Sequence, residues 1–391
     1  MTADFAADAN PSRSGRMPAR GGRPLRVLQV CARFLPDMGG IETHVSEVAR
    51  RLGARDDIDM TVLTTDRSRR RTRAERGDGF TIRRIPAWPR KQDFYIAPQL
   101  YDAVRSGNWD VVHCQGVHTA VPVLALIAAR RSGIPSVLTF HTGGHSSSAR
   151  NAMRSLQWKA MGRTIRGAAH CIAVSRFEAE TFIAGVGVER DRVSVVGNGG
   201  GLPAPTPGVV PVPGKVMSVG RLERYKGHQR VVEALPYLRR LMPGAHLEIL
   251  GAGPMAEELR GIAARLGVPD AVSIRHVPPG DRLAMADALA SANVIAAFSD
   301  YEAHPIAVIE SLAIGRPVVG YDVAGIGDLV ADGLVTGVAP GTGPSDAALA
   351  MAEAMCRPAP DHGHVPTWDN CVDRVLEVYR KVTRPADRTV A

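Results

Sequence analysis

Two glutamates in the second half of the chain, Glu302 and Glu310, are separated by seven residues that include Pro305. Proline suits the first turn of a helix, because the N–H that it lacks is unpaired there in any case. The apolar residues that follow predict a short helix that ends at Gly315. The unpaired N–H groups at the start of such a helix attract anions such as a diphosphate. One carboxylate could then reach past the phosphates to a sugar, and the other could accept two hydrogen bonds from a ribose diol.

A second group of charged residues follows a strand predicted at residues 216–219, in the sequence Gly220-Arg221-Leu-Glu-Arg-Tyr-Lys226-Gly227. Arg221 and Lys226 would leave the end of that strand near the same edge of the sheet. Two cations at this place could neutralise the charge of a departing diphosphate. The alternative is a charged surface loop, and the stretch taken alone fits both interpretations.

The sequence Gly251-Ala-Gly253-Pro-Met-Ala256 follows another predicted strand and matches the dinucleotide-binding pattern G-x-G-x-x-A. An NAD(P)-dependent dehydrogenase is therefore an alternative function. That class needs an acidic residue at the end of the next strand, where the ribose diol binds. Here the next strand ends at His276 and Val277 without an acid. Tight turning and close approach of the backbone are the favoured uses of the glycines.

A loop that is rich in hydroxyl and imidazole groups begins at His141, after a strand predicted at residues 136–140. Its position at a strand end favours a role for His141 in a cleft. The loop residues that could face an acceptor are His145, Ser146 and Ser147. The chain has no HExxH or CxxC motif and no Asp-x-Asp after a strand, so neither a metal site nor a cofactor is expected.

The elements that must carry these residues alternate between strand and helix. A strand at residues 26–31, a glycine loop and a helix at 41–52 form the first unit, and further strands are predicted at 60–64, 111–113, 136–140 and 171–174. A second series has strands at 216–219, 246–250, 272–276, 294–298 and 318–321, with helices at 228–241 and 255–266. This alternation predicts two α/β domains with parallel sheets, which leave a cleft between the carboxyl ends of their strands.

The segment at residues 199–213 is dense in proline and glycine, so it can continue neither a helix nor a central strand. We place the domain boundary there. The predicted organisation is a disordered tail at 1–24, a first domain at 25–200, a linker at 201–214, a second domain at 215–365, and a last helix with a tail at 366–391.

The composition, with 45% apolar and 22% charged residues among 391, is typical of a soluble globular protein. Aromatic residues make up only 5%, which argues against a stacking surface for nucleic acid. The net charge of +9 fits an enzyme that handles phosphates, or simply a basic, solvated surface. Five widely spaced cysteines and the absence of an apolar leader predict a cytoplasmic protein. The arginine-rich stretch from Arg67 to Arg76 is interpreted as a solvated, mobile loop, with contact to an acidic membrane or an acceptor as the alternative.

Together these motifs resemble those of the retaining glycosyltransferases of family 4. The resemblance spans residues 26 to about 382 and rests on Gly39-Gly40-Ile-Glu42, His141, Asn198-Gly199, Gly220 to Gly227, Gly251-Ala-Gly253-Pro254 and the Glu302-x7-Glu310 element. It implies the GT-B fold, in which two Rossmann-like, doubly wound domains face a central cleft and the last helix crosses back to the first domain. It also implies transfer of a hexose-type sugar from a nucleoside-diphosphate sugar, UDP- or GDP-linked, to a hydroxyl acceptor. That acceptor would be a natural product or a cell-envelope glycan or lipid.

The resemblance assigns roles by position. Arg221 and Lys226 would bind the donor diphosphate, Glu310 the ribose, and Glu302 the transferred sugar. His141 would contact that sugar near the reacting carbon, and with Arg221, Lys226 and Glu302 it would form the catalytic set. The other donor-binding positions would be Gly39, Gly40, Asn198, Gly220, Gly251, His276, Val277, Ala303, His304, Pro305, Ile306 and Ala307.

Two departures from the family pattern bear on the donor. Ala303-His304-Pro305 stands where many members have a run such as Gly-Phe-Gly, and His276 stands where many have glycine. The mechanism that the resemblance implies is a front-face route in which the leaving diphosphate accepts the acceptor's proton and no metal is required. A nucleotide-sugar epimerase of the same fold, which transfers no sugar, is the other alternative.

Overall fold

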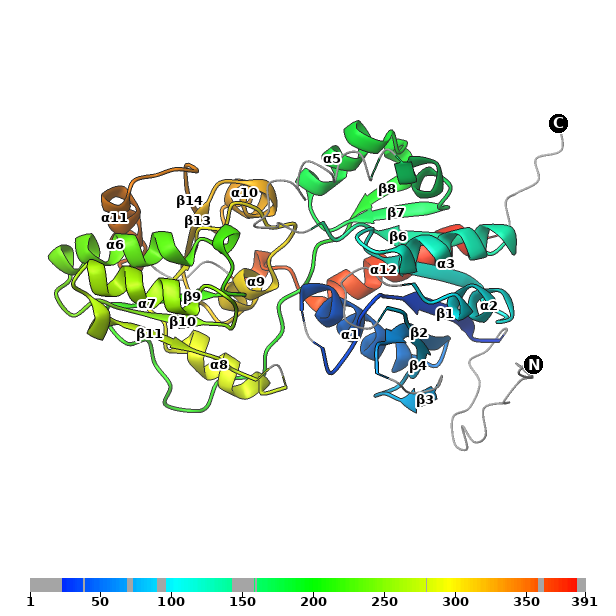
Figure 1. Cartoon of the computed structure of the whole chain (residues 1–391), viewed down its shortest axis with the longest axis horizontal. Coiled ribbons are helices and arrows are strands. Elements are labelled where there is room, and N and C mark those ends of the chain that lie inside the picture. The colour runs from blue at the N-terminus through cyan, green and yellow to red at the C-terminus, as the bar shows by residue number, and fades with distance from the viewer. Residues whose placement is uncertain are drawn as a thin grey trace.

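The computed structural model describes residues 23–37, 39–68, 73–89, 96–142, 158, 160–278, 280–357 and 362–384. The chain forms two lobes, each built around one β-sheet (Figure 1). The first sheet has eight strands in the order β3-β4-β2-β1-β5-β6-β7-β8, and the second has six in the order β11-β10-β9-β12-β13-β14. Neighbouring strands pair in parallel except β3 and β4. The predicted pair of doubly wound α/β domains is confirmed.

The strands of the first sheet are β1 (Leu25–Val30), β2 (Ile58–Asp66), β3 (Arg73–Arg76), β4 (Thr81–Pro86), β5 (Val111–Gln115), β6 (Ser136–Thr139), β7 (His170–Ala173) and β8 (Val193–Val195). Those of the second are β9 (Lys215–Val219), β10 (His246–Leu250), β11 (Val272–Arg275), β12 (Val294–Ala297), β13 (Val318–Tyr321) and β14 (Thr336–Val338). The central strands are buried almost throughout, as parallel strands covered on both faces must be.

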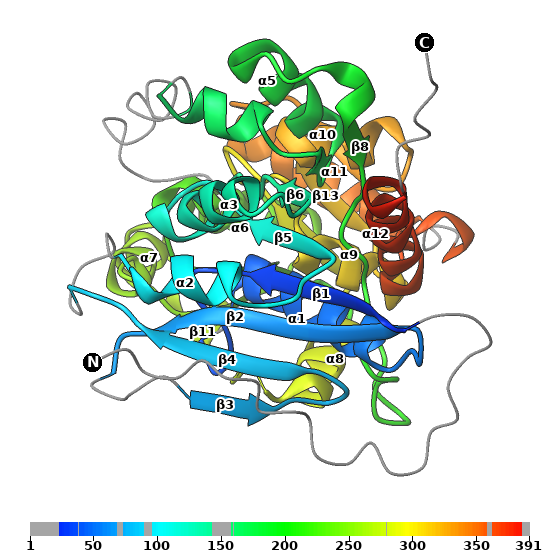
Figure 2. The same ribbon diagram turned by 90° about the vertical axis from the view of Figure 1, so that its right-hand side faces the viewer.

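Helices cover both faces of the first sheet (Figure 2). One face packs against α2 (Gln99–Arg105), α3 (Ala120–Arg131) and α5 (Arg176–Val186). The other packs against α1 (Gly40–Gly53) and the last helix, α12 (Trp368–Thr383). The second sheet is sandwiched in the same way. One face packs against α6 (His228–Leu241), α7 (Ala256–Arg265) and α11 (Pro344–Met355), and the other against α8 (Arg282–Ala290), α9 (Ile306–Ala313) and α10 (Ala324–Ala331).

The last helix returns from the second lobe to the first, as predicted. Its apolar side chains, among them Trp368 and Val375, share one buried cluster with Val27 of β1 and Val45 of α1. Tyr379 extends this contact into the sheet. Its hydroxyl lies 2.7 Å from His113 Nδ1 and accepts a hydrogen bond of 3.2 Å from the side-chain N–H of Gln29. The tyrosine therefore ties α12 to two neighbouring strands, β1 and β5.

The arginine-rich stretch differs from its prediction as a mobile loop. Residues 73–76 form the edge strand β3, antiparallel to β4, while residues 69–72 lie outside the described part of the chain. Glu75 of this strand accepts a bond of 3.0 Å from the side chain of Arg84, which is buried. Glu75 pairs with Arg84 of β4 and with Arg73 of its own strand, and these ion pairs help to stabilise what composition alone suggests is a coil.

Three other strands, β4, β8 and β14, were not predicted because they are short or polar and lie towards the sheet edges. All five cysteines are unpaired, and four of them are buried. Within the described ranges, no helix has both the length and the apolar character needed to cross a bilayer.

Replacing Tyr379 by phenylalanine should destabilise the first lobe by about 1–3 kcal/mol, because it leaves buried groups on His113 and Gln29 without their partner. Urea unfolding followed by tryptophan fluorescence would measure the effect, since Trp368 lies in the same helix. Tyr237→Phe is the matched control, because that tyrosine is 39% exposed on α6. Equal unfolding midpoints for the two variants would show that the hydroxyl does not anchor α12.

Candidate active site

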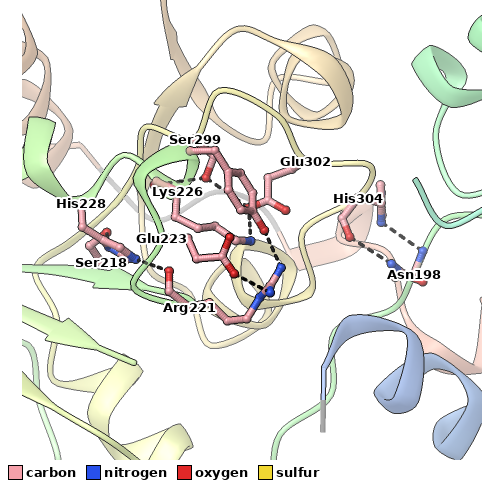
Figure 3. A network of polar contacts seen from close by, with 10 residues as sticks. Asn198, Ser218, Arg221, Glu223, Lys226, His228, Ser299, Glu302 and His304 are labelled. Atoms are coloured by element: carbon pink, nitrogen blue, oxygen red, sulfur yellow. Dashed lines mark hydrogen bonds and ion pairs between the residues drawn. The ribbon is translucent and has the colours of Figure 1, made fainter. Parts of the chain in front are cut away.

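The order of strands in the second sheet creates an opening at one point. Strands β10 and β11 extend from one side of β9, whereas β12, β13 and β14 extend from the other. The loops that follow β9 and β12 therefore diverge above neighbouring strand ends, which is where open α/β sheets bind ligands. Figure 3 shows Arg221 and Lys226 in the loop after β9 and Glu302 in the loop after β12.

An ion pair joins the two loops. Lys226, after β9, lies with its Nζ 2.5 Å from Glu302 Oε1, after β12. The hydroxyl of Ser299 donates a second bond of 3.1 Å to the same carboxylate oxygen. Burial disfavours the ammonium, but the neighbouring Glu302 outweighs it, so the pKa of Lys226 is raised above its ordinary value. The lysine is therefore a fixed positive charge at the opening.

Backbone contacts hold the same two loops together beneath the ion pair. Gly227 has φ of 74°, and a Cβ there would lie 1.9 Å from the carbonyl oxygen of Phe298. The N–H of Asp300 donates to the carbonyl of Tyr225 over 2.8 Å. Only glycine permits both the left-handed turn and this close approach, so residue 227 fixes the position of Lys226 relative to Glu302.

Arg221 supplies a second cation at the same edge. Its guanidinium donates to Glu223 over 2.6 Å and to the Tyr225 hydroxyl over 2.7 Å, and its side chain remains 65% exposed. His228, at the start of α6, lies 2.8 Å from Ser218 Oγ and 3.2 Å from the carbonyl oxygen of Arg221. Arg221 is thus held at its backbone while its charged end stays accessible.

The glycines after β9 and β10 serve close packing. A Cβ on Gly251 would lie 1.9 Å from the carbonyl oxygen of Gly220, and one on Gly253 would lie 2.7 Å from that of Leu222. Gly220 and Gly253 also have φ of 152° and 157°. This agrees with the interpretation of the G-x-G-x-x-A match as a tight turn that supports the Arg221 loop.

Helix α9 begins between the two predicted glutamates. Pro305 precedes its first residue, and no side chain caps its N-terminus. The amides of the first turn, at Ile306 and Ala307, have no acceptor within the helix itself. Glu310 is on the helix, 4% exposed, and forms an ion pair with Arg282 at the start of α8. Burial raises the pKa of Glu310 and Arg282 opposes that rise.

The residues between Glu302 and α9 are held by contacts with both lobes. The carbonyl of Glu302 accepts from Gly325 N–H over 2.8 Å, and a Cβ on Gly325 would lie 1.9 Å from the carbonyl oxygen of Ala303. His304 turns towards the first lobe (Figure 3). The N–H of Asn198 donates to His304 Nδ1 over 3.0 Å, and the Asn198 side chain donates to the His304 carbonyl over 2.9 Å.

Asn198 was predicted to bind the donor, and the structure gives it a different set of partners. Besides its two bonds to His304, its side-chain oxygen lies 2.9 Å from His44 Nδ1. Burial lowers the pKa values of His44 and His304 to about 4, so both imidazoles are neutral at pH 7. Asn198 therefore joins the two lobes, and its contact with the donor stays a prediction.

The first lobe contributes His141, which follows β6. It has φ of 48°, rare for a residue other than glycine. Its Nε2 lies 2.7 Å from Gln115 Oε1, and its carbonyl accepts a bond from His118. Because a side-chain carbonyl oxygen accepts, Nε2 carries the proton. Burial lowers the pKa of His141 well below its ordinary value, so this side chain is an uncharged hydrogen-bonding group.

The glycine loop after β1 is the part of the first lobe that faces Arg221 of the second lobe. Gly39 caps α1, and a Cβ there would lie 2.7 Å from a carboxylate oxygen of Glu42, whereas none of the described atoms lies within 4 Å of a Cβ on Gly40. Burial raises the pKa of Glu42, and both Arg33 and Arg221 act to lower it. Arg221 thus acts electrostatically across the lobe boundary on the first turn of α1, which begins at Gly40.

Other predicted site residues lie further from this centre or outside the described ranges. His276 and Val277 follow β11, two strands away from β9; His276 is exposed and Val277 is buried. The predicted acceptor residues, His145, Ser146 and Ser147, lie outside the described part of the chain.

Several residues of the site were missed from sequence. Arg282 and Gln115 gave no local signal, because their partners lie far away in the chain. Glu178, which contacts the residue after His141, had one: Ser175-x-x-Glu178 is a capping-box pattern at the start of α5.

Two family models match the chain. The model described as Glycosyltransferase Family 4 matches residues 38–199, and the one described as Glycosyl transferases group 1 matches residues 211–358. Together they cover both lobes.

Full-length relatives agree with these models. The D-inositol 3-phosphate glycosyltransferase of Acidothermus cellulolyticus is 30% identical over 412 residues, which cover 91% of this chain and 90% of the relative. The enzyme of the same name from Nocardiopsis dassonvillei is 28% identical over 420 residues, covering 93% and 96%.

Solved structures show the same architecture. Sucrose-phosphate synthase from Thermosynechococcus elongatus has a TM-score of 0.71 at 18% identity, covering 91% of this chain and 98% of that one. Anabaena HepE in complex with UDP and glucose has a TM-score of 0.69 at 17% identity, covering 91% and 99%. The chain belongs to the family 4 glycosyltransferases and has their GT-B fold.

Proposed function

We propose that this enzyme transfers a hexose-type sugar from a nucleoside-diphosphate sugar to a hydroxyl acceptor, with retention of the anomeric configuration. The observation that carries the proposal is the grouping at one opening of two cations, Arg221 and Lys226, with the uncapped start of α9. Cationic side chains and helix amides are the groups that bind a diphosphate. Glu302 and Glu310 lie on either side of that seat in the chain, where one can bind the sugar and the other the ribose.

The donor proposal has further support from proteins of the same fold. HepE has been solved with UDP and with UDP-glucose, and the pneumococcal O-GlcNAc transferase GtfA with UDP and GlcNAc. A uridine diphosphate sugar is therefore the first donor to assay. The relatives are named for D-inositol 3-phosphate, which makes a phosphorylated polyol the first acceptor to assay.

In the proposed mechanism, the acceptor oxygen attacks the anomeric carbon as the bond from that carbon to the donor phosphate oxygen breaks. The acceptor proton passes to the departing phosphate oxygen on the same face of the sugar. Arg221 and Lys226 stabilise the charge that develops on this leaving group. Glu302 is engaged by Lys226 and Ser299, which fits a binding carboxylate better than a nucleophile. The two cations supply the charge that a metal would otherwise provide, so the proposed reaction is metal-independent.

His141 and Gly40 would complete the donor site from the first lobe. The neutral imidazole of His141, with its proton held on Nε2 by Gln115, can offer a polar edge to the sugar without adding charge. The open space at Gly40 lets its backbone approach the diphosphate. The enzyme thus contributes position and electrostatics more than covalent chemistry.

Lys226→Ala should lower the turnover number for sugar transfer by about 10²-fold or more, because it removes a preorganised charge from the leaving group. The assay is release of nucleoside diphosphate at saturating donor. Arg224→Ala is the matched control, because Arg224 lies in the same short helix, Arg224–Lys226, and pairs with Glu258 at the surface. The assignment of Lys226 fails if both variants turn over at the wild-type rate.

Glu310→Gln should weaken the binding of UDP by about 2 kcal/mol, or about thirtyfold, because a neutral amide replaces a charged acceptor of ribose hydrogen bonds. Calorimetry with UDP and with 2′-deoxy-UDP separates this role from a general disturbance. The substitution should matter much less for the deoxy ligand, which lacks one of the hydroxyls. Glu353→Gln, at an exposed position of α11, is the control. Equal losses for both ligands would contradict a ribose contact.

A further inference from the structure

One buried carboxylate lies behind the proposed catalytic centre and is not part of the donor site. Glu178, in the first turn of α5, is fully buried. Its Oε1 accepts from the backbone N–H of Thr142 and from the Thr142 hydroxyl, both over 2.6 Å. Its Oε2 accepts from Val174 N–H over 2.8 Å. Three donors around one buried carboxylate give it the partners that a buried charge requires.

The hydroxyl of Thr142 connects this carboxylate to the other lobe. It lies 2.5 Å from the hydroxyl of Tyr301. Because the single proton of Thr142 Oγ1 is donated to Glu178, its lone pair is left to accept from Tyr301. The hydrogen bonds therefore run in one direction, from Tyr301 through Thr142 to Glu178.

Two members of this hydrogen-bond chain, Thr142 and Tyr301, directly neighbour proposed catalytic residues in the sequence. Thr142 directly follows His141, whose φ of 48° is held by what surrounds it. Tyr301 directly precedes Glu302, and its ring also packs edge-on against Phe177 of α5, with centroids 5.8 Å apart. The bonds of Thr142 and Tyr301 therefore act on residues directly next to His141 and Glu302.

We propose that Glu178, Thr142 and Tyr301 are positioning residues that set the distance and orientation between His141 in the first lobe and Glu302 in the second. The proposal rests on the catalytic roles given to those two residues above. Glu178 holds the strained turn after β6 by accepting a hydrogen bond from the Thr142 backbone. The hydroxyls of Thr142 and Tyr301 then connect this turn to the second lobe. Substrate then meets both walls of the site in a preset arrangement, which is the condition for efficient transfer.

A second contact between the lobes provides a comparison. Arg176 of α5 forms an ion pair of 2.9 Å with Asp332, just after α10, and both side chains are about half exposed. This contact also crosses the boundary, but it involves no residue next to His141 or Glu302. Arg176 also donates to the carbonyl of Asp328 in α10, so a substitution of Asp332 weakens this contact without removing it. It separates the effect of aligning the catalytic residues from that of a weakened contact between the lobes.

The test is a double-mutant cycle on Thr142→Val and Tyr301→Phe, each of which removes one hydroxyl and keeps the side-chain shape. Both should lower the turnover number about tenfold, with the KM for the donor changed less than about twofold, since geometry and not binding is lost. The double variant should be no slower than the slower single variant, because the same chain is already broken. Thr142→Ser, which keeps the hydroxyl, should restore most of the rate, and Asp332→Asn should leave it unchanged.

Melting temperatures of the same variants give a readout that needs no reaction. Each single substitution should lower the melting temperature, and the double variant should lower it by less than the sum. Strictly additive losses would overturn the chain of hydrogen bonds whether or not sugar transfer is seen. Wild-type rates in both single variants would overturn the positioning role, as would an equal loss in Asp332→Asn. If the wild-type enzyme transfers no sugar, the proposed function fails, and the melting cycle still decides whether the chain exists.

Discussion

The position of β9 beside β12 is the constraint on which the rest of the site depends. Successive strands are added on one side of β9 up to β11, and on its other side from β12 onwards. The loops that follow β9 and β12 therefore open away from each other over adjacent strand ends. One loop brings Lys226 and the other brings Glu302, and the two side chains form an ion pair that is mostly buried. Removing only one partner would leave a buried charge uncompensated. In the proposed function, the pair thus determines where the diphosphate would meet a positive charge.

Close backbone packing makes this arrangement rigid. Gly227 sits against Phe298, Gly251 against Gly220, and Gly325 against Ala303. Each contact leaves no room for a Cβ, so the loops that carry the charged residues have few alternative conformations. The conformational strain in these turns is small, because glycine tolerates both left-handed dihedral angles and the close approach of another backbone segment. Rigid loops hold donors and charges in place before a substrate arrives, which is what electrostatic stabilisation of a leaving group needs.

Besides the Arg176–Asp332 ion pair, polar contacts between neutral groups connect the first lobe to the residues next to the site. Asn198 with His304, and Thr142 with Tyr301, cross the boundary without placing a net charge there. The last helix adds an apolar anchor, because Trp368 and Val375 are buried among residues of β1 and α1. The first lobe therefore has a defined position at the site, while the two cations that we propose bind the diphosphate, Arg221 and Lys226, lie in the second lobe.

Helices and strands with a strong local sequence pattern were predicted correctly. Helix 228–241 and strands 246–250 and 318–321 were predicted to the residue, because apolar periodicity and flanking glycines mark them. Their places after predicted strands put Lys226 and Glu302 near the same sheet edge, but the ion pair between them was not predicted. The partners of Glu310 and Asn198 could not be predicted, because Arg282 and His304 meet them only through the tertiary fold. The edge strand at Arg73–Arg76 was missed since its stability comes from pairing with β4 and not from its own composition.

Thermal shift with a panel of UDP, GDP, dTDP, ADP, NAD and NADP tests the central claim most directly, that the opening between β9 and β12 binds a nucleoside diphosphate. A ligand that binds only the folded protein, at 100 times its dissociation constant, adds about 2.7 kcal/mol of stability, which is a shift of several degrees. We expect such a shift from at least one diphosphate, UDP first, and none from the nicotinamide dinucleotides. A shift with NAD or NADP and none with any diphosphate would contradict the account.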